Sequence, residues 1–176
     1  MGGANIMKWV LAALVVIAIA STAQAAEVFS RPFGISMGEK IKALDHPRRM
    51  GGTDVNVRSV PEPHPLLARY SVVATDAAGV CQVKGYAPLS RDGSRKVDAM
   101  VRHLGEVFGE PRLLPGNRDP DCTGIWLWSL NERDKGDVEL VTVHRYEQAG
   151  KTAAIVTFEF ANHKDCEPAP TPNPFK

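Results

Sequence analysis

The sequence has almost no net charge and lacks the short motifs of several common enzyme classes. Its 21 Lys and Arg residues nearly balance its 20 Asp and Glu residues. A chain without a strong field of one sign has little long-range attraction for nucleic acid or an anionic membrane. Glycine-rich phosphate loops, H-x-x-x-H pairs of the H-E-x-x-H type and C-x-x-C pairs are absent. We therefore expect no cofactor, no bound metal and no nucleic-acid partner.

An apolar segment near the N-terminus indicates export. Lys8 precedes an uninterrupted apolar run of 12 residues, Trp9–Ala20, and Ala23-Gln24-Ala25 fits a signal-peptidase site. The run is short for a membrane span, which takes about 20 residues. The sequence predicts a signal peptide over 1–25, cleaved on export, so that no stable membrane insertion follows; an uncleaved anchor is the alternative.

The mature chain has the size of one domain. Removal of 25 residues from 176 leaves 151, with 20 basic and 20 acidic residues, because the removed segment carries one Lys and no acid. That length suffices for one hydrophobic core. We predict a single domain over 26–166, followed by an extended tail over 167–176 in which proline is frequent.

The first half of the domain predicts a short helix and three strands. Ser36 and Glu39 have the spacing of a capping box, and Pro47 ends the helix that they begin. Strands are expected over 53–60, 69–75 and 80–89, because apolar residues alternate there. A loop over 61–68 separates the first two, because it holds three prolines in five positions.

The second half predicts a longer helix, a long loop and three strands. Apolar residues recur at helical spacing over 94–111, and a loop follows over 112–124. Strand patterns occupy 125–130, 138–146 and 152–160, and short polar connections favour an antiparallel meander. We predict an α+β fold in two layers, with helices covering antiparallel sheet, arranged as two helix-plus-three-strand halves.

The last strands carry apolar side chains on both faces. In 125–130, Trp126 and Trp128 share one face and Ile125 and Leu127 the other. Either the two halves pack against each other or one patch faces a partner, and we favour the first arrangement, since monomers rarely expose large apolar patches.

Three cysteines survive cleavage, which leaves one unpaired in an oxidising compartment. Cys81 lies on a strand and Cys166 follows the last strand, where a crosslink would prevent fraying. We predict a Cys81–Cys166 disulfide; pairing of Cys122 with either of them is the alternative.

Cys122 has poor surroundings for a nucleophile. Asp119 and Asp121 precede it, and their negative charges disfavour a thiolate, with Arg118 offering only partial compensation. Trp126 and Trp128 are expected to fill the core, or else to form an aromatic platform. Trp126, Trp128, Arg118 and Cys122 together define the candidate binding surface.

Five stretches resemble segments of small secreted or periplasmic proteins of Gram-negative bacteria: FGISMG, YSVVAT, GVCQV, FGEP and FEFANHKDC. The order of elements after GISMG is also similar to the tandem helix–sheet units of β-lactamase-inhibitor-like proteins and outer-membrane assembly lipoproteins. The resemblance implies a periplasmic binding or accessory module.

These observations favour a non-enzymatic periplasmic protein that binds another envelope protein through its sheet face or the 112–124 loop. The alternative is a small periplasmic enzyme or ligand-binding domain with a site near Cys122, Asp119 and Arg118. A minor alternative is metal handling at His163, which stands three residues before Cys166.

Overall fold

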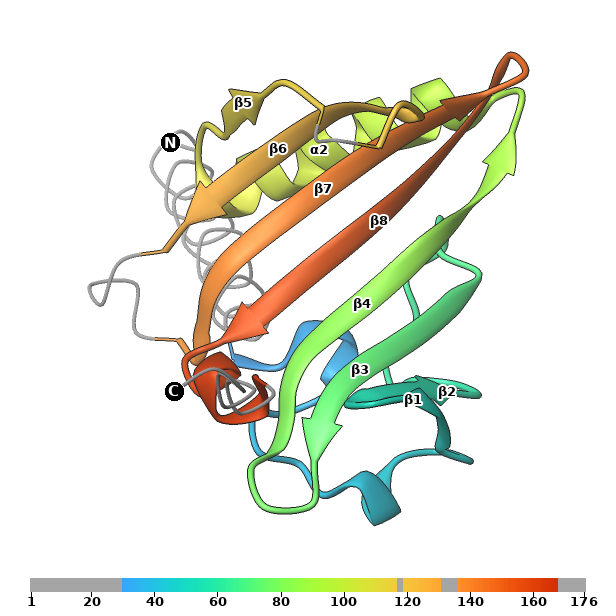
Figure 1. Cartoon of the computed structure of the whole chain (residues 1–176). Helices are drawn as coiled ribbons and strands as arrows, with labels where there is room; N and C mark the ends of the chain where they lie inside the picture. Colours follow the sequence, from blue (N-terminus) through green and yellow to red (C-terminus); the bar gives the residue numbers. More distant parts are fainter. Residues whose placement is uncertain (1–29, 117–118, 131–135, 168–176) are drawn as a thin grey trace, which may run out of the picture.

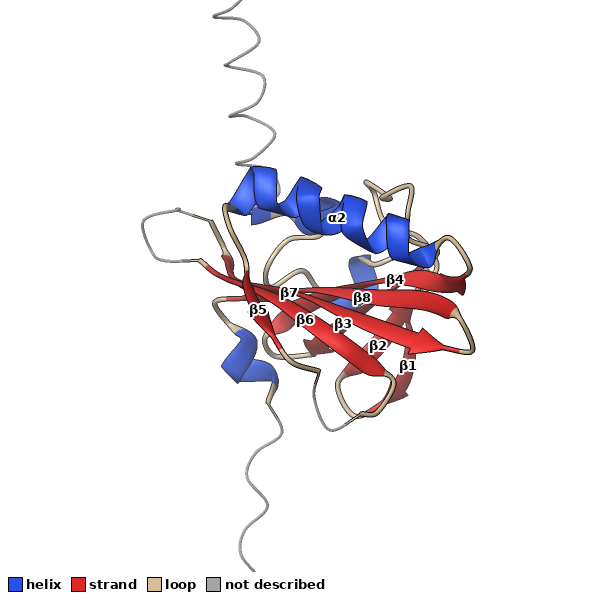
Figure 2. Cartoon of the chain, turned by 90° about the horizontal axis from the view of Figure 1, so that it is seen from above, coloured by secondary structure: helices blue, strands red, loops and turns tan. Residues whose placement is uncertain are grey.

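A computed structural model describes residues 30–116, 119–130 and 136–167. The predicted signal peptide, Arg118 and residues 168–176 of the predicted tail lie outside them. The fold is one antiparallel sheet of eight strands in the order β1-β2-β3-β4-β8-β7-β6-β5 (Figure 1). A helix, α2, lies across one face of the sheet (Figure 2). The α+β class is confirmed.

The strand bounds are β1 Arg48–Gly51, β2 Asp54–Val57, β3 Arg69–Thr75, β4 Gly79–Ser90, β5 Arg112–Leu114, β6 Cys122–Ser129, β7 Val138–Gln148 and β8 Lys151–Phe160. The helical elements are η1 Pro32–Gly34, η2 Ile41–Ala43, α2 Gly93–Phe108 and η4 His163–Cys166, of which the η segments are short 3-10 turns.

Strand register defines two faces of the sheet. One row crosses four strands through Val83, Phe158, Val141 and Trp128, and these side chains are buried on the side of α2. We call this side the covered face. The next row places Lys84, Thr157, Thr142 and Leu127 on the opposite side, which we call the open face. The alternation follows from the two-residue period of a strand.

The helix predicted over 94–111 corresponds to α2. Its apolar stripe buries Val97, Met100 and Leu104 against the covered face. The helix ends at Phe108, because Gly109 adopts a left-handed φ of 85°. The indole nitrogen of Trp128 donates a hydrogen bond to the Gly109 carbonyl at 2.8 Å, which ties the helix end to β6.

The helix predicted from Ser36 is wrong. The only helical element in this segment is the 3-10 turn η2. The amide of Ser36 donates to Glu39 Oε2 at 3.1 Å, so one contact of a capping box is present on a turn. Gly38 takes a left-handed φ of 71° and Lys40 is extended, so helical backbone does not propagate beyond the turn.

The long loop predicted over 112–124 is also wrong in part. Residues 112–114 form the edge strand β5, in which Leu113 pairs with Trp126, and β6 begins at Cys122. A strand of three residues is too short to carry a recognisable alternation. The remaining strand predictions agree with β2 to β4 and β6 to β8, and β6, β7 and β8 form the expected antiparallel meander.

The two halves of the chain share one sheet. Pairing of β4 with β8 joins them edge to edge, with Gly85 opposite Val156. They therefore do not pack face to face, which was the favoured arrangement, and the apolar side chains of the open face have no covering half.

The predicted disulfide is present. Cys81 at the start of β4 is bonded to Cys166 in η4, with their α-carbons 6.2 Å apart, and Cys122 is free and buried. Among the described residues, no helix is both long and apolar enough to cross a bilayer.

Candidate functional site

The structure separates the residues of the predicted binding surface. Trp126 and Trp128 point to the covered face, where Trp128 is buried and Trp126 packs against the core. Cys122 pairs in register with Tyr146, which belongs to the open face. The tryptophans and the thiol therefore lie on opposite sides of the sheet.

Cys122 is buried beside an aromatic neighbour. Its side chain is 5% exposed, and its Sγ lies 4.0 Å from the Gly124 carbonyl oxygen. The pKa of Tyr146 is raised, chiefly by burial and secondarily by Cys122, Asp119 and Tyr86. The low accessibility of this thiol opposes attack on a substrate.

The histidine near the last cysteine does not build a metal site. His163 Nδ1 contacts the Phe160 carbonyl at 3.2 Å and lies 3.7 Å from Glu139. Cys166 is consumed by the disulfide. Over the described ranges, no group of three or more His, Cys, Asp or Glu side chains is arranged to hold a metal ion.

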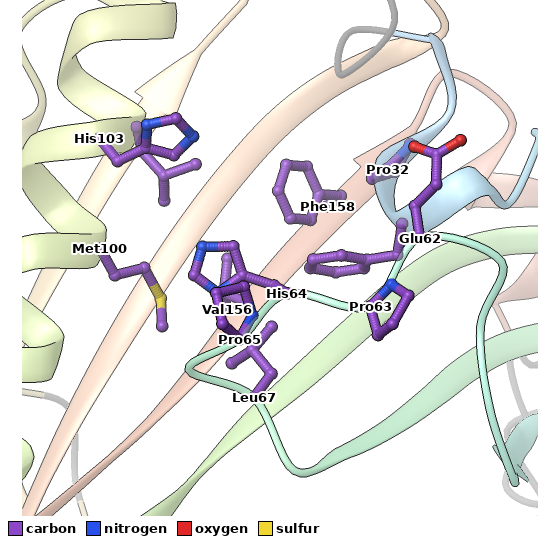
Figure 3. A pocket seen from close by; sticks show the side chains of 12 residues that line it. Pro32, Glu62, Pro63, His64, Pro65, Leu67, Met100, His103, Val156 and Phe158 are labelled. Atoms are coloured by element: carbon purple, nitrogen blue, oxygen red, sulfur yellow. The ribbon is translucent and has the colours of Figure 1, made fainter.

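A concavity of about 280 Å³ lies between α2, the 61–68 loop and the covered face (Figure 3). We call it the α2 pocket. Its volume is at the small end of the range for ligand sites, roughly 300–1,000 Å³. Its apolar wall comes from η1, the loop, α2 and β8: Phe33, Leu67, Met100, Leu104, Val156 and Phe158. The exposed prolines Pro63 and Pro65 form its rim, and the buried Pro32 lies in its wall.

The 61–68 loop is held in place at two points. The Tyr70 hydroxyl accepts a hydrogen bond from the His64 amide at 2.7 Å and lies 3.4 Å from the His64 carbonyl. Leu67 packs directly over Gly85 of β4, where an ideal Cβ would lie 2.5 Å from Leu67 Cδ1. The glycine therefore allows the loop to approach the sheet closely, and the prolines limit its conformations.

Phe33 closes the pocket from an unusual backbone conformation. Its φ is 58°, in the left-handed region, which costs a bulky L-residue about 1–3 kcal/mol. Its ring contacts the rings of Tyr70 and Phe158 edge to face, with centroids 5.0 Å and 5.3 Å away. Strain of this kind concentrates at ligand sites, and here it places an aromatic wall on the cavity.

Three polar side chains line the pocket: Glu62, His64 and His103. The two imidazole rings lie with their centroids 6.3 Å apart. Burial lowers the pKa of His64, and the nearby His103 lowers it further. His103 also faces Glu106 at 3.9 Å on the next turn of α2. Figure 3 shows Glu62 on the side of the cavity away from His103.

Residues 34–38 match the G-x-S-x-G consensus of serine hydrolases, a match overlooked at the level of the sequence. That consensus requires a sharp turn between a strand and a helix. Ser36 instead lies between the 3-10 turns η1 and η2, half-buried. The segment therefore lacks the geometry of a nucleophile elbow.

The α2 pocket was not predicted from the sequence. The prolines of 61–68 indicated a rigid loop, but no local pattern connects His64 to His103, which stands on a helix beyond two intervening strands. No family model, no curated protein and no solved structure matches the chain.

Proposed function

We propose that this chain is an exported, non-enzymatic binding protein that holds a small apolar molecule in the α2 pocket. The observation that carries the proposal is the apolar concavity itself, closed by Phe33 in a strained conformation and lined by a few convergent polar groups. In this proposal the molecule is two-layered, with α2, η1 and the 61–68 loop on the covered face of the sheet.

The side chains of the pocket favour binding over catalysis. Its lining contains two imidazoles and one carboxylate, but no Ser, Thr, Cys or Lys side chain. Covalent catalysis needs a nucleophile within reach of a base. A site of this composition can orient a ligand without reacting with it.

The Cys81–Cys166 disulfide supports an exported address. Structural disulfides form and persist in oxidising compartments such as the periplasm. Together with the apolar N-terminal segment, this favours a periplasmic protein.

Binding of the fluorescent apolar probe N-phenyl-1-naphthylamine to the mature chain, residues 26–176, tests the proposal. Pro65→Trp places a large ring at the rim and should weaken probe binding at least tenfold. Pro115→Trp, at an exposed proline outside the pocket, is the matched control and should bind normally. Absence of probe binding, or equal binding by both variants, contradicts the proposal.

A second candidate function is binding of another envelope protein through the open face. An apolar row crosses five strands there through Tyr86, Ile155, His144, Ile125 and Leu114, all of them half-buried. In Figure 1, β6 and β7 pass in front of α2, which lies on the opposite side of the sheet. An apolar surface on a partner would complete the burial of this row.

Cross-linking in periplasmic extract with matched variants tests this second function. Ile125→Lys puts a charge in the apolar row, whereas Ser129→Lys puts the same charge at an exposed position on the same face of β6. A genuine partner is lost with Ile125→Lys and retained with Ser129→Lys. A partner captured equally by both variants, or by neither, argues against the open face.

A further inference from the structure

We propose that the ligand of the α2 pocket is an acidic amphiphile, a short hydrocarbon chain that ends in a carboxylate. The headgroup accepts a hydrogen bond from His64 Nε2 and lies beside His103, and the chain lies along Phe33, Val156 and Phe158. This inference rests on the proposed function and adds the chemical class of the ligand.

The loop fixes the tautomer of His64. The amide of Leu66 donates to His64 Nδ1 at 3.2 Å, so Nδ1 acts as an acceptor. In the neutral ring the proton is then on Nε2, which becomes a donor. No acceptor among the described residues lies within hydrogen-bond distance of Nε2. The pocket therefore offers an N–H group and favours a ligand with an acceptor oxygen.

Two imidazoles at one end favour an anion over a neutral acceptor. The rings of His64 and His103 share one end of the pocket (Figure 3), and charge on both is unfavourable while the pocket is empty. A carboxylate between them offsets that repulsion and accepts the hydrogen bond from His64 Nε2. His64 presents an N–H donor and not a lone pair to the pocket, which disfavours a metal ion as its partner there.

The other charged groups near the pocket orient the ligand. The Glu62 carboxylate lies away from the imidazoles, where its Oε1 approaches Gly34. It repels an acidic headgroup from that end. Glu106 faces His103 from the next helical turn, and the Tyr70 hydroxyl is engaged with the His64 backbone. Headgroup and chain therefore have separate ends of the cavity.

Displacement of N-phenyl-1-naphthylamine by octanoate and by 1-octanol tests the inference, because the two share a chain length and differ in the headgroup. A hydrogen bond to a charged group contributes about 1.5–3 kcal/mol, which corresponds to octanoate binding roughly 10- to 100-fold more tightly.

Three variants locate the headgroup. His64→Phe removes the donor and should abolish the preference for octanoate. His64→Gln keeps an N–H donor, so it should keep part of the preference for octanoate. His144→Phe changes a half-buried histidine of the open face and is the matched control, with the preference unchanged.

The outcomes separate the two proposals. Equal binding of octanoate and octanol overturns the proposed acidic headgroup, while the proposal that the pocket binds an apolar molecule still stands. A preference that survives in His64→Phe also overturns the inference, because the headgroup then binds elsewhere. Failure of the probe and of both octyl ligands to bind overturns the proposed function itself.

Discussion

The covered face and the open face of the sheet are built from the same strands, yet they end in different environments. Along β7 and β8, Val143 and Val156 are 0% and 2% exposed, whereas His144 and Ile155 next to them remain half-buried. Strand alternation explains why neighbouring residues of one strand lie on opposite faces of the sheet. The difference indicates that the covered face is buried because α2, η1 and the 61–68 loop lie over it, whereas no element of the described residues lies over the open face at these positions.

The covered face is itself divided. The helix α2 lies over one part of it, while η1 and the 61–68 loop cover another (Figures 1 and 2). The α2 pocket lies where these two covers meet. A junction between a helix and a loop is harder to fill than the space under a single helix, and this accounts for a cavity at this place.

The largest effect is expected from truncation on the covered face. Phe158→Ala removes a ring that packs against Phe33 and Phe108, and the free energy of unfolding should fall by about 3–5 kcal/mol. Ile155→Ala, three positions away on the open face, should lose less than half as much, because its side chain is only half-buried. Guanidinium denaturation measures both, and equal losses would show that the open face is also core.

The disulfide should give the next largest effect. It closes a loop between residues 85 positions apart, and its removal in a Cys81→Ser, Cys166→Ser variant should cost about 2–4 kcal/mol. Cys122→Ser, at the buried free thiol on the open-face side, should cost less, about 1 kcal/mol, through the loss of one buried sulfur. Denaturation of both variants without reductant measures the difference; a disulfide variant as stable as the parent contradicts it.

A smaller effect is expected where the loop meets the sheet. Gly85→Ala places a Cβ against Leu67 and should lower the unfolding free energy by about 1 kcal/mol. The displaced loop should also weaken probe binding in the α2 pocket. Gly105→Ala, on the outer side of α2 with open space around its Cβ, should leave probe binding unchanged. Weakening by both variants would point to general instability.

The smallest effect concerns pH and compares a histidine from each face. Burial and His103 lower the pKa of His64, and burial lowers the pKa of His144. Below the unfolded pKa of about 6.5, the unfolded chain then binds more protons than the folded one. The free energy of unfolding should therefore be highest above about pH 6.5 and fall as the pH drops through the lower pKa values of the folded protein. His64→Gln and His144→Gln should each flatten this decline in thermal melts. The exposed His46→Gln is the control, and an increase in stability toward acid pH would contradict the prediction.

Local patterns predicted much of the fold. The stripe of Val97, Met100 and Leu104 was sufficient for α2, and alternation was sufficient for the longer strands. The helix expected at Ser36 failed because Gly38 takes a left-handed conformation that a spacing rule does not foresee. β5 was missed because its three residues are stabilised by pairing with β6 and carry no pattern of their own. The family resemblance and the predicted export stay predictions.

The sequence by itself determined which residues alternate along the longer strands and which form the apolar stripe of α2, because both depend on local spacing. It predicted the Cys81–Cys166 disulfide but left pairing of Cys122 open, and the structure contains Cys81–Cys166. Only the tertiary structure decided that β4 pairs with β8, which face stays open, and that His64 and His103 share a cavity. Contacts between distant segments depend on which strands adjoin and in which register, and the period of a single strand carries no information about its neighbour.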